Sequence, residues 1–292
     1  MLVRSARPFV LVILAGLGAE PASAESCPGV FAGGLAPVVV NPKIAAQTRA
    51  LCFEAFAVLD SGVTRTPLYS AEHLTRDSIA AARTVARDDS FHEEARLPAD
   101  SRARLEDYVR SGFDRGHLSP AGDMPTESAQ AQSFSLANIV PQDRTMNRGI
   151  WGDIEEGVRR FATRRGSVYV VTGVIFAGDS LRQIGAGVLV PTQLYKAIYD
   201  PSTGQAGAYL VTNAPGRDWK SISVDALRDA AGIDVFPGLP PAAKATAMTL
   251  PDPHASSRGD APRHEQTWRD WLGREAMRLL RRTVRDVLRS IF

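Results

Sequence analysis

The sequence predicts an α+β fold with a central, mainly antiparallel β-sheet flanked by helices. Three successive segments have strand-like patterns, at residues 167–176, 187–200 and 205–212. The turn-forming residues 200–204 indicate that the last two segments form a hairpin. Helical patterns lie on either side of these strands, at residues 147–164 and 223–231. Because strands and helices do not alternate strictly along the chain, the order favours an antiparallel sheet over a parallel one.

The composition is that of an ordinary globular protein. The 292 residues suffice for one large domain or two small ones, and 44% of them are hydrophobic and 23% charged. The formal net charge is only +2. A chain so close to neutral gives no compositional support for nucleic-acid binding, so any basic site must be local.

The N-terminal residues predict a signal peptide over residues 1–24. Arg4 and Arg7 supply positive charge, residues 9–19 form a short apolar run, and residues 22–24 have the small-residue pattern of a cleavage site. The apolar run is short for a membrane span, although a retained anchor is the alternative. We therefore expect an exported protein, periplasmic or secreted, with no integral membrane segment in its mature form.

The chain has two cysteines, Cys27 and Cys52, and both follow this peptide. In an oxidising compartment two cysteines are more often paired than free, so we expect a disulfide between them. Such a bond would tie the new N-terminus to residues 50–58, within an N-terminal extension at residues 25–60. As a structural staple it would contribute about 2–4 kcal/mol of stability.

The first third of the mature chain predicts few regular elements. Residues 25–41 are interrupted by Gly and Pro and predict irregular structure. Residues 52–59 alternate as in a strand, and residues 67–74 predict a further strand or turn. Residues 83–107 are polar and loop-like, with a short helix near residues 101–109.

The central block combines a strand, a loop and helices. Residues 113–118 have the pattern of a strand, residues 119–123 form a turn-rich loop, and residues 126–132 are a candidate short helix. Residues 139–143 predict a turn, because the proline among them disfavours a helix before it. Across residues 147–164, apolar side chains recur at three- and four-residue steps, which indicates an amphipathic helix.

The end of the chain changes character. A helix over residues 223–231 ends at Gly232, and the predicted domain comprises residues 25–238. Residues 239–264 are rich in Pro, Ala, Ser and Asp and predict a linker. Residues 265–292 carry an apolar stripe among many arginines, which predicts a basic amphipathic helix. This helix would pack on the domain or form a homodimer, with a membrane surface as the alternative.

Two polar side chains of the central block suit phosphodiester hydrolysis. His117 can take a proton from water near neutral pH, although a histidine bonded to a carbonyl group is the ordinary alternative. Asn147 can offer a neutral oxygen to Mg²⁺, a cation that prefers oxygen ligands and keeps several waters. The alternative is that Asn147 caps the helix that follows it.

Four further polar side chains lie near these two. Eight residues of helix rise roughly 12 Å, so Glu155 is not expected to bind the same ion as Asn147 directly, although it could reach metal-bound water. Arg159 could form an ordinary salt bridge with Glu155. Arg115 could hold a phosphate oxygen or pair with its neighbour Asp114. Asn138 could orient the site or satisfy loop backbone.

Three stretches of the central block carry a family resemblance. Residues 108–120 contain Asp-Arg-Gly-His, residues 135–142 contain Ala-Asn-Ile-Val-Pro-Gln, and residues 147–155 begin Asn-Arg-Gly-Ile-Trp. Together they resemble the DNA/RNA non-specific endonuclease family, a ββα-metal group of nucleases. The resemblance covers about residues 69–232 and implies that family's α+β fold with its ββα-metal active-site motif.

The resemblance implies a role for each site residue. These are a general base at His117, the sole direct metal ligand at Asn147, a holder of metal-bound water at Glu155, charge stabilisation by Arg115 and Arg159, positioning by Asn138, and a further upstream arginine. Arg87 is the better candidate for that arginine, with Arg83 nearby as the alternative. The implied cofactor is Mg²⁺, with Mn²⁺ as a substitute, and the implied substrates are DNA and RNA, cleaved to 5′-phosphate products.

Two other functions remain open at this point. A non-catalytic nucleic-acid-binding or envelope protein could use the same scaffold, and it would bind DNA in a salt-sensitive way without cleaving it. A nuclease selective for one sugar is the other alternative. The extension at residues 25–60 and the segment after residue 238 both depart from the family pattern.

Overall fold

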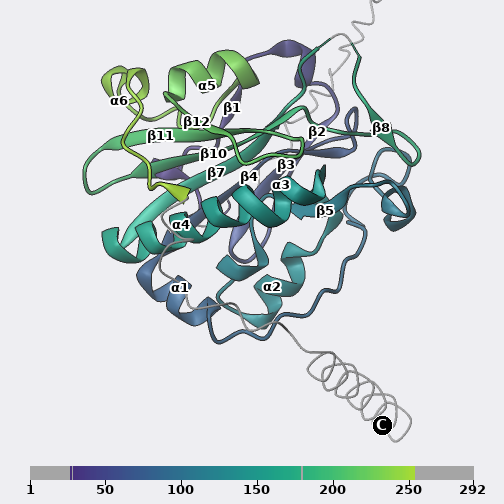
Figure 1. Cartoon of the computed structure of the whole chain (residues 1–292), viewed down its shortest axis with the longest axis horizontal. Coiled ribbons are helices and arrows are strands. Elements are labelled where there is room, and N and C mark those ends of the chain that lie inside the picture. Colours follow the sequence, from purple (N-terminus) through teal and green to yellow (C-terminus); the bar gives the residue numbers. More distant parts are fainter. Residues whose placement is uncertain (1–26, 28, 179, 254–292) are drawn as a thin grey trace, which may run out of the picture.

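A seven-stranded antiparallel sheet forms the scaffold of the computed structural model, which describes residues 27, 29–178 and 180–253 (Figure 1). The strand order across the sheet is β12-β11-β10-β7-β4-β3-β2. The strands are β2 (Thr48–Cys52), β3 (Phe56–Ser61), β4 (Thr66–Thr75), β7 (Ser167–Ile175), β10 (Gln193–Asp200), β11 (Gln205–Thr212) and β12 (Trp219–Ile222). The predicted α+β class with a mainly antiparallel sheet is confirmed.

Helices cover both faces of this sheet. In Figure 1, α4 (Gly152–Arg165), α1 (Arg76–Ala82) and α2 (Glu127–Ser133) lie on one side, and α5 (Val224–Ala231) and α6 (Pro241–Ala245) lie on the other. Alternation along β7 places its side chains in two cores. Val170 and Val174 join the cluster that contains Ile154 of α4, whereas Val171 joins the cluster that contains Leu227 of α5. A central strand buried on both faces explains the continuous apolar run in its sequence.

The central strands β4 and β7 are neighbours in space although the chain between them is long. Thr75 pairs with Ser167, and the amide of Arg76 donates to the carbonyl of Gly166 at 3.0 Å. Residues 76–166 therefore leave the sheet and return to it at one point. Besides α1, α2 and α4, this insertion contains η3 (Leu105–Tyr108), β5 (Asp114–His117), η4 (Ala121–Asp123), η5 (Leu136–Asn138), β6 (Ile139–Gln142), α3 (Arg144–Met146) and η6 (Asn147–Trp151).

Two sequence-based predictions within the insertion are wrong in detail. Residues 139–143 were expected to form a turn, but β6 pairs antiparallel with β5, and Pro141 stands opposite Arg115. The pair is a separate two-stranded sheet, so both strands are edges, where proline is tolerated. The helix expected from residue 147 is regular only from Gly152. Before it, η6 is a π-helical turn in which Gly149 departs from helical geometry with φ −103° and ψ −109°.

Several short or unexpected elements complete the fold. The single strand expected at residues 52–59 is divided between the end of β2 and the start of β3. The chain turns between them, where the amide of Phe53 donates to the carbonyl of Phe56 at 2.9 Å. The segment expected as one strand at 187–200 is divided into β9 and β10. Helix α1 and strand β12 were not predicted. The remaining elements are η1 (Ala32–Gly34), β1 (Val38–Val39), η2 (Pro42–Ile44), β8 (Gln183–Ile184), β9 (Val188–Leu189) and β13 (Ile233–Asp234).

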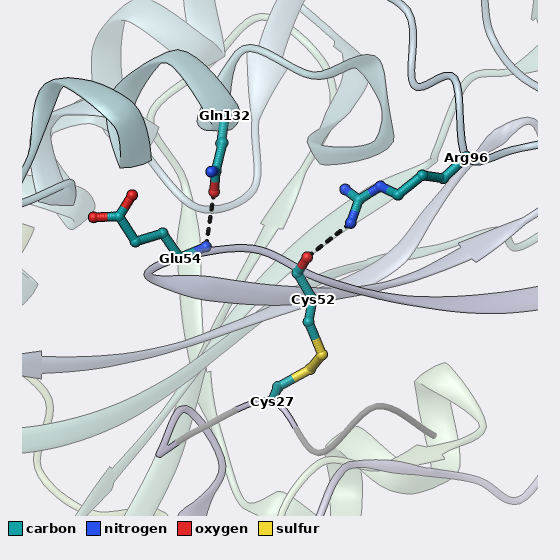
Figure 2. Close-up of a disulfide and its surroundings, with 5 residues drawn as sticks. All are labelled: Cys27, Cys52, Glu54, Arg96 and Gln132. Atoms are coloured by element: carbon teal, nitrogen blue, oxygen red, sulfur yellow. Dashed lines mark hydrogen bonds between the residues drawn. A yellow bond between two sulfur atoms is a disulfide. The ribbon is translucent and has the colours of Figure 1, made fainter. Parts of the chain in front are cut away.

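The predicted disulfide between Cys27 and Cys52 is present (Figure 2), with the two Cα atoms 5.4 Å apart. It fastens the chain at residue 27 to β2, the edge strand of the large sheet. The carbonyl of Cys52 accepts a hydrogen bond from Arg96 at 2.8 Å, and the amide of Glu54 donates to Gln132 Oε1 at 2.7 Å. The end of the sheet that carries the disulfide is thus also hydrogen-bonded to the insertion.

The packed structure continues past residue 238, where the predicted linker begins. Leu239, Met248 and Leu250 are buried, and the amide of Met248 donates to the carbonyl of Ala206 on β11 at 2.8 Å. The predicted signal peptide, the rest of the linker and the terminal helix at 265–292 lie outside the described residues. Within the described part of the chain, no helix combines the length and the apolar character needed to cross a membrane.

Candidate active site

The β5–β6 hairpin fixes the backbone around His117. His117 pairs with Ile139, and Gly116 pairs with Val140. A side chain at Gly116 would collide with Gln142, so glycine allows Gln142 to lie across the strand. From that position Gln142 Nε2 donates to the carbonyl oxygen of His117 at 3.3 Å. The Asp-Arg-Gly-His sequence therefore needs its glycine for close packing inside the hairpin.

The His117 ring lies between two phenylalanines. The ring centroids of Phe134 and Phe91 are 4.8 and 5.6 Å from it, and Phe134 meets it edge to face. Although the residue is partly exposed, its Nε2 atom is buried and has no hydrogen-bond partner among the described residues. Burial, helped by the nearby Arg87 and opposed by Asp89, lowers the pKa of His117 to about 3. The ring is therefore neutral at neutral pH, with a nitrogen available to accept a proton.

Asp114 orients Asn147 at the start of the π-helical turn. Asn147 Nδ2 donates to Asp114 Oδ2 at 3.2 Å, and Asn147 Oδ1 accepts no hydrogen bond from any described residue. The same carboxylate binds Arg148 Nε at 2.7 Å and Arg144 Nε at 3.2 Å. Burial tends to raise the pKa of Asp114, but the hydrogen bonds from these three residues hold it below its ordinary value. The Asn147 amide is thus turned so that its oxygen remains available.

Arg115 and Arg87 stack on the same aromatic cluster. The Arg115 guanidinium lies 4.1 Å from the centroid of Phe91, and that of Arg87 lies 5.5 Å from the centroid of Phe134. Arg115 is exposed and forms no ion pair with a described residue, so the alternative pairing with Asp114 is not what the structure has. Arg87 Nε is 2.6 Å from Asp89 Oδ1.

One open cavity of about 470 Å³ is lined by Arg115, Asn147 and Phe91, whereas His117 itself is not among its lining residues. Its charged lining consists of Arg87, Arg115, Arg144, Arg148 and Asp114, and Asn147 lies among them. Four guanidinium groups face a single carboxylate there, so the cavity is strongly basic although the whole chain is almost neutral. Arg83 is not among the lining residues. The expectation that any basic site must be local is confirmed.

Glu155 and Arg159 lie on α4 but do not pair as an ordinary salt bridge. Arg159 Nη1 is 2.8 Å from Asp123 Oδ1, and its Nε is 2.9 Å from Glu156 Oε2. Burial raises the pKa of Glu155 to about 7, opposed by the charges of Lys196 and Arg159. Neither Glu155 nor Arg159 lines the basic cavity, although the charge of Arg87 acts on both Glu155 and His117.

Asn138 is fully buried, and all its side-chain hydrogen bonds go to the backbone. Its Oδ1 accepts from the amide of Ser119 at 3.0 Å, and its Nδ2 donates to the carbonyls of Ser119 and Ser133 at 2.8 and 2.9 Å. The amide of Leu118 also donates to the Asn138 carbonyl at 3.0 Å. This arrangement fixes the chain immediately after His117 through bonds between Asn138 and the backbone.

Sequence reasoning missed two buried charges behind the site, Glu72 on β4 and Lys196 on β10. Each is 1% exposed, and Lys196 Nζ is 3.9 Å from Glu72 Oε1. Burial raises the pKa of Glu72 well above its ordinary value. The negative charge of Asp123 raises this pKa further, whereas the positive charge of Lys196 lowers it. A signal for both was present, because each is a charged residue inside an otherwise apolar strand pattern, and Lys196 is one of four lysines.

The donor set suits a hard divalent cation that keeps most of its own water. Asn147 Oδ1 is a neutral oxygen with no hydrogen-bond partner in the described part of the chain, next to a cavity rather than enclosed by ligands. The described residues contain no group of three or more His, Cys, Asp or Glu side chains that could enclose a metal ion. A single neutral oxygen fits Mg²⁺ or Mn²⁺ better than a metal that needs a complete protein cage.

Comparison with known proteins agrees with this geometry. A family model described as DNA/RNA non-specific endonuclease matches residues 38–242. "Nuclease EXOG, mitochondrial" from Danio rerio is 35% identical over 196 residues, which are 60% of this chain and 57% of that protein. "Endonuclease G, mitochondrial" from Caenorhabditis elegans is 32% identical over 215 residues, which are 66% of this chain and 70% of that protein. The chain thus spans little more than half of the zebrafish relative.

A solved structure agrees with the fold as well. A chain from the crystal structure of the EndoG/EndoGI complex, described as showing the mechanism of EndoG inhibition, superposes with a TM-score of 0.59 at 27% identity. The superposition covers 63% of this chain and 84% of that one. Since the family match includes the β5–β6 hairpin, the π-helical turn and all seven strands of the large sheet, this chain belongs to the DNA/RNA non-specific endonuclease family.

Proposed function

We propose that this protein is an exported endonuclease that hydrolyses phosphodiester bonds of DNA and RNA with the help of Mg²⁺, leaving 5′-phosphate ends. One observation carries the proposal: the neutral ring of His117 has a buried Nε2 with no partner among the described residues, and it packs against Phe91, which lines the cavity together with four arginines and Asn147. A base, phosphate-binding cations and an available oxygen ligand are the components that phosphodiester hydrolysis needs.

The base would act on water. His117 Nε2 takes a proton from the water molecule that attacks phosphorus, and the bond from phosphorus to the 3′-oxygen breaks. The free ring has a low pKa because it is buried beside Arg87. A bound phosphate brings negative charge to the same place, which raises the pKa of the ring toward the range of an effective base. The neutral form is therefore kept ready, and its basicity increases when substrate binds.

The other side chains would hold substrate and cation. Arg115 and Arg87 reach the cavity and stabilise the charge that develops on the phosphate oxygens. Asn147 would hold the cation through Oδ1, and Glu155 would hold one of its waters. Arg159, fixed by Asp123, keeps positive charge near Glu155. A divalent cation bound there would act as a Lewis acid toward the phosphate and the leaving oxygen.

Export is the remaining part of the proposal. The Cys27–Cys52 disulfide supports an oxidising compartment, such as the periplasm or the outside of the cell. The relatives from zebrafish and Caenorhabditis elegans are named as mitochondrial proteins, so the proposal of export rests on this chain's own sequence and disulfide. For the terminal helix at 265–292 we propose packing on the domain or homodimer formation.

The test uses the purified mature chain with plasmid DNA and with RNA, each with and without a chelator. We expect cleavage of both, loss of cleavage with the chelator, and loss with His117→Gln. The matched control is His73→Gln, because His73 stacks on Tyr169 at 4.2 Å and its Nε2 is already hydrogen-bonded to Ser167 Oγ at 2.7 Å. Undiminished cleavage by His117→Gln would reject His117 as the base. Salt-sensitive DNA binding without any cleavage would instead support the non-catalytic alternative.

A further inference from the structure

The basic cavity also has an apolar wall that phosphate binding does not explain. Leu105, Val109 and Phe113 line it together with the arginines, and we call these three side chains the apolar wall. Val109 is 67% exposed, the highest value among the large hydrophobic side chains that the structure describes, and Leu105 is 37% exposed. Apolar surface left open beside a functional cavity commonly marks a contact with a ligand.

The backbone between Val109 and Phe113 of the apolar wall has an uncommon conformation. Arg110 has a φ of +55° and Gly112 a φ of +84°, so the chain enters the left-handed region twice between Val109 and Phe113. That region is uncommon for a residue with a side chain and is often found where a segment is held for function. The strained segment leads directly into β5, so the wall and the catalytic hairpin form one continuous stretch of chain.

Positive charge borders the wall. The guanidinium of Arg182 lies 4.6 Å from the centroid of the Phe113 ring, and Arg182 forms no ion pair with a described residue. Arg115, two residues beyond Phe113, projects into the same cavity. An apolar surface flanked by guanidinium groups matches a nucleotide, in which a flat base with little charge is joined to a phosphate.

We propose that the apolar wall binds the base of an unpaired nucleotide next to the phosphate that is cleaved. This inference rests on the proposed nuclease function and adds a substrate preference, for single-stranded or locally opened nucleic acid over intact duplex. In a duplex the face of each base is covered by its neighbours, so only an unstacked base can lie against these side chains.

Contact between the apolar wall and a base would not distinguish one base from another. Leu105, Val109 and Phe113 have no hydrogen-bonding groups in their side chains. Tyr108, the neighbouring aromatic residue, is buried, and its hydroxyl donates to the carbonyl of Ile139 at 3.4 Å. Every base has an apolar face, whereas discrimination among bases requires donors and acceptors at their edges. The wall therefore favours unpaired nucleotides of any identity.

The test compares Val109→Ser with a matched control, Val63→Ser. Val63 is also an exposed valine, 53% accessible, and it lies in the turn between β3 and β4 and does not line the basic cavity. The substrates are a single strand, the duplex of the same sequence, and the same strand with abasic tetrahydrofuran units in place of nucleosides. Cleavage is measured as kcat/KM, and binding is measured by fluorescence anisotropy without added metal.

We expect the wild type to cleave the single strand faster than the duplex. Val109→Ser should lower kcat/KM and binding for the single strand by about fivefold to tenfold, because it removes about two apolar carbon groups from the contact, whereas its effect on the abasic strand should be much smaller. Val63→Ser should match the wild type throughout. Phe113→Leu is a second variant that removes the aromatic face but keeps apolar volume, and it should show the same selective loss.

Two results would overturn the inference. One is equal cleavage of single strand and duplex by the wild type, and the other is an equal loss on normal and abasic strands in Val109→Ser. If the wild type cleaves nothing, the proposed nuclease function fails by itself. The anisotropy comparison of normal and abasic strands then still decides whether the wall binds bases, because it requires no turnover.

Discussion

Lys196 Nζ donates a hydrogen bond at 3.4 Å to the backbone carbonyl of Leu118, the residue that follows His117. The same ammonium group donates to Thr172 Oγ1 at 2.6 Å and lies 5.6 Å from the centroid of the Trp151 ring. Trp151 is the last residue of the π-helical turn that begins at Asn147. One buried cation in the large sheet thus contacts both segments that carry the proposed base and the proposed metal ligand.

Lys196→Met is expected to destabilise the protein strongly, because it leaves the carboxyl group of Glu72 buried without its cation. Removing one partner of a buried charge pair costs up to about 3–5 kcal/mol, and less where the remaining carboxyl group takes up a proton, which the raised pKa of Glu72 favours. The double variant Glu72→Gln/Lys196→Met should recover part of the loss, since it removes the second charge as well. Urea unfolding at pH 8 measures both. A loss below about 1 kcal/mol in the single variant would show that the pair is not coupled in this way.

His117 is expected to make stability depend on pH between about 3 and the ordinary range of histidine. Its pKa is lowered to about 3 in the folded protein, so the unfolded chain binds a proton more readily. The stabilising contribution of the neutral ring is complete above about pH 6.5 and is lost as the pH falls toward 3. The melting temperature of His117→Gln minus that of the wild type should therefore increase as the pH falls across this range. A constant difference would contradict the buried, neutral ring.

Glu155 is expected to show the opposite dependence. Burial raises its pKa to about 7, so the folded protein binds the proton more readily than the unfolded chain. Its contribution to stability is complete below about pH 4.5 and is lost as the pH rises through 7. Without added metal, Glu155→Gln should be more stable than the wild type at pH 8 and similar to it at pH 4. Thermal unfolding at the two pH values is the measurement, and greater stability of the variant only at pH 4 would contradict it.

Asp114→Asn is expected to weaken cation binding without removing the proposed ligand. Asp114 holds the Asn147 amide through Nδ2, and loss of such a supporting carboxylate commonly costs about tenfold to a hundredfold in metal affinity. The Mg²⁺ concentration for half-maximal activity should rise accordingly. Asp225→Asn is the matched control, because Asp225 pairs with Arg228 on α5, on the other side of the sheet. An unchanged Mg²⁺ dependence in Asp114→Asn would mean that Asp114 does not orient Asn147.

The parts of the fold that follow from local signals could be predicted from the sequence. Helix α5 begins at Ser223, whose side chain accepts from the amide of Ala226, and it ends at Gly232 in the left-handed conformation. The hairpin of β10 and β11 was marked by its turn. The pairing of Cys27 with Cys52 followed from their number and the expected compartment.

The parts that could not be predicted depend on contacts between distant segments. Pro141 indicated a turn, but it occupies a strand because its partner β5 forms a sheet of only two strands. Lys196 is buried because Thr172, Leu118 and Glu72 surround its ammonium group, and none of them is near it in the sequence. The departure at Gly149 from helical geometry is likewise invisible in a pattern of apolar residues that continues through it. Local patterns located the site residues, whereas tertiary packing determined their partners.

Thr75 and Ser167 pair at the point where the insertion leaves the large sheet and returns to it, so the sheet and the proposed catalytic residues come from different parts of the chain. All the residues proposed to act in hydrolysis, from Arg87 to Arg159, belong to the insertion between these two partners. The strands on either side of the insertion pair with each other along most of their length, so their alignment does not require the insertion to have a particular length or order of elements. The insertion can therefore change in length without a change in the register of β4 and β7, provided that α4 still packs on the sheet. This order affects folding kinetics, because β4 cannot pair with β7 until the whole insertion has been synthesised.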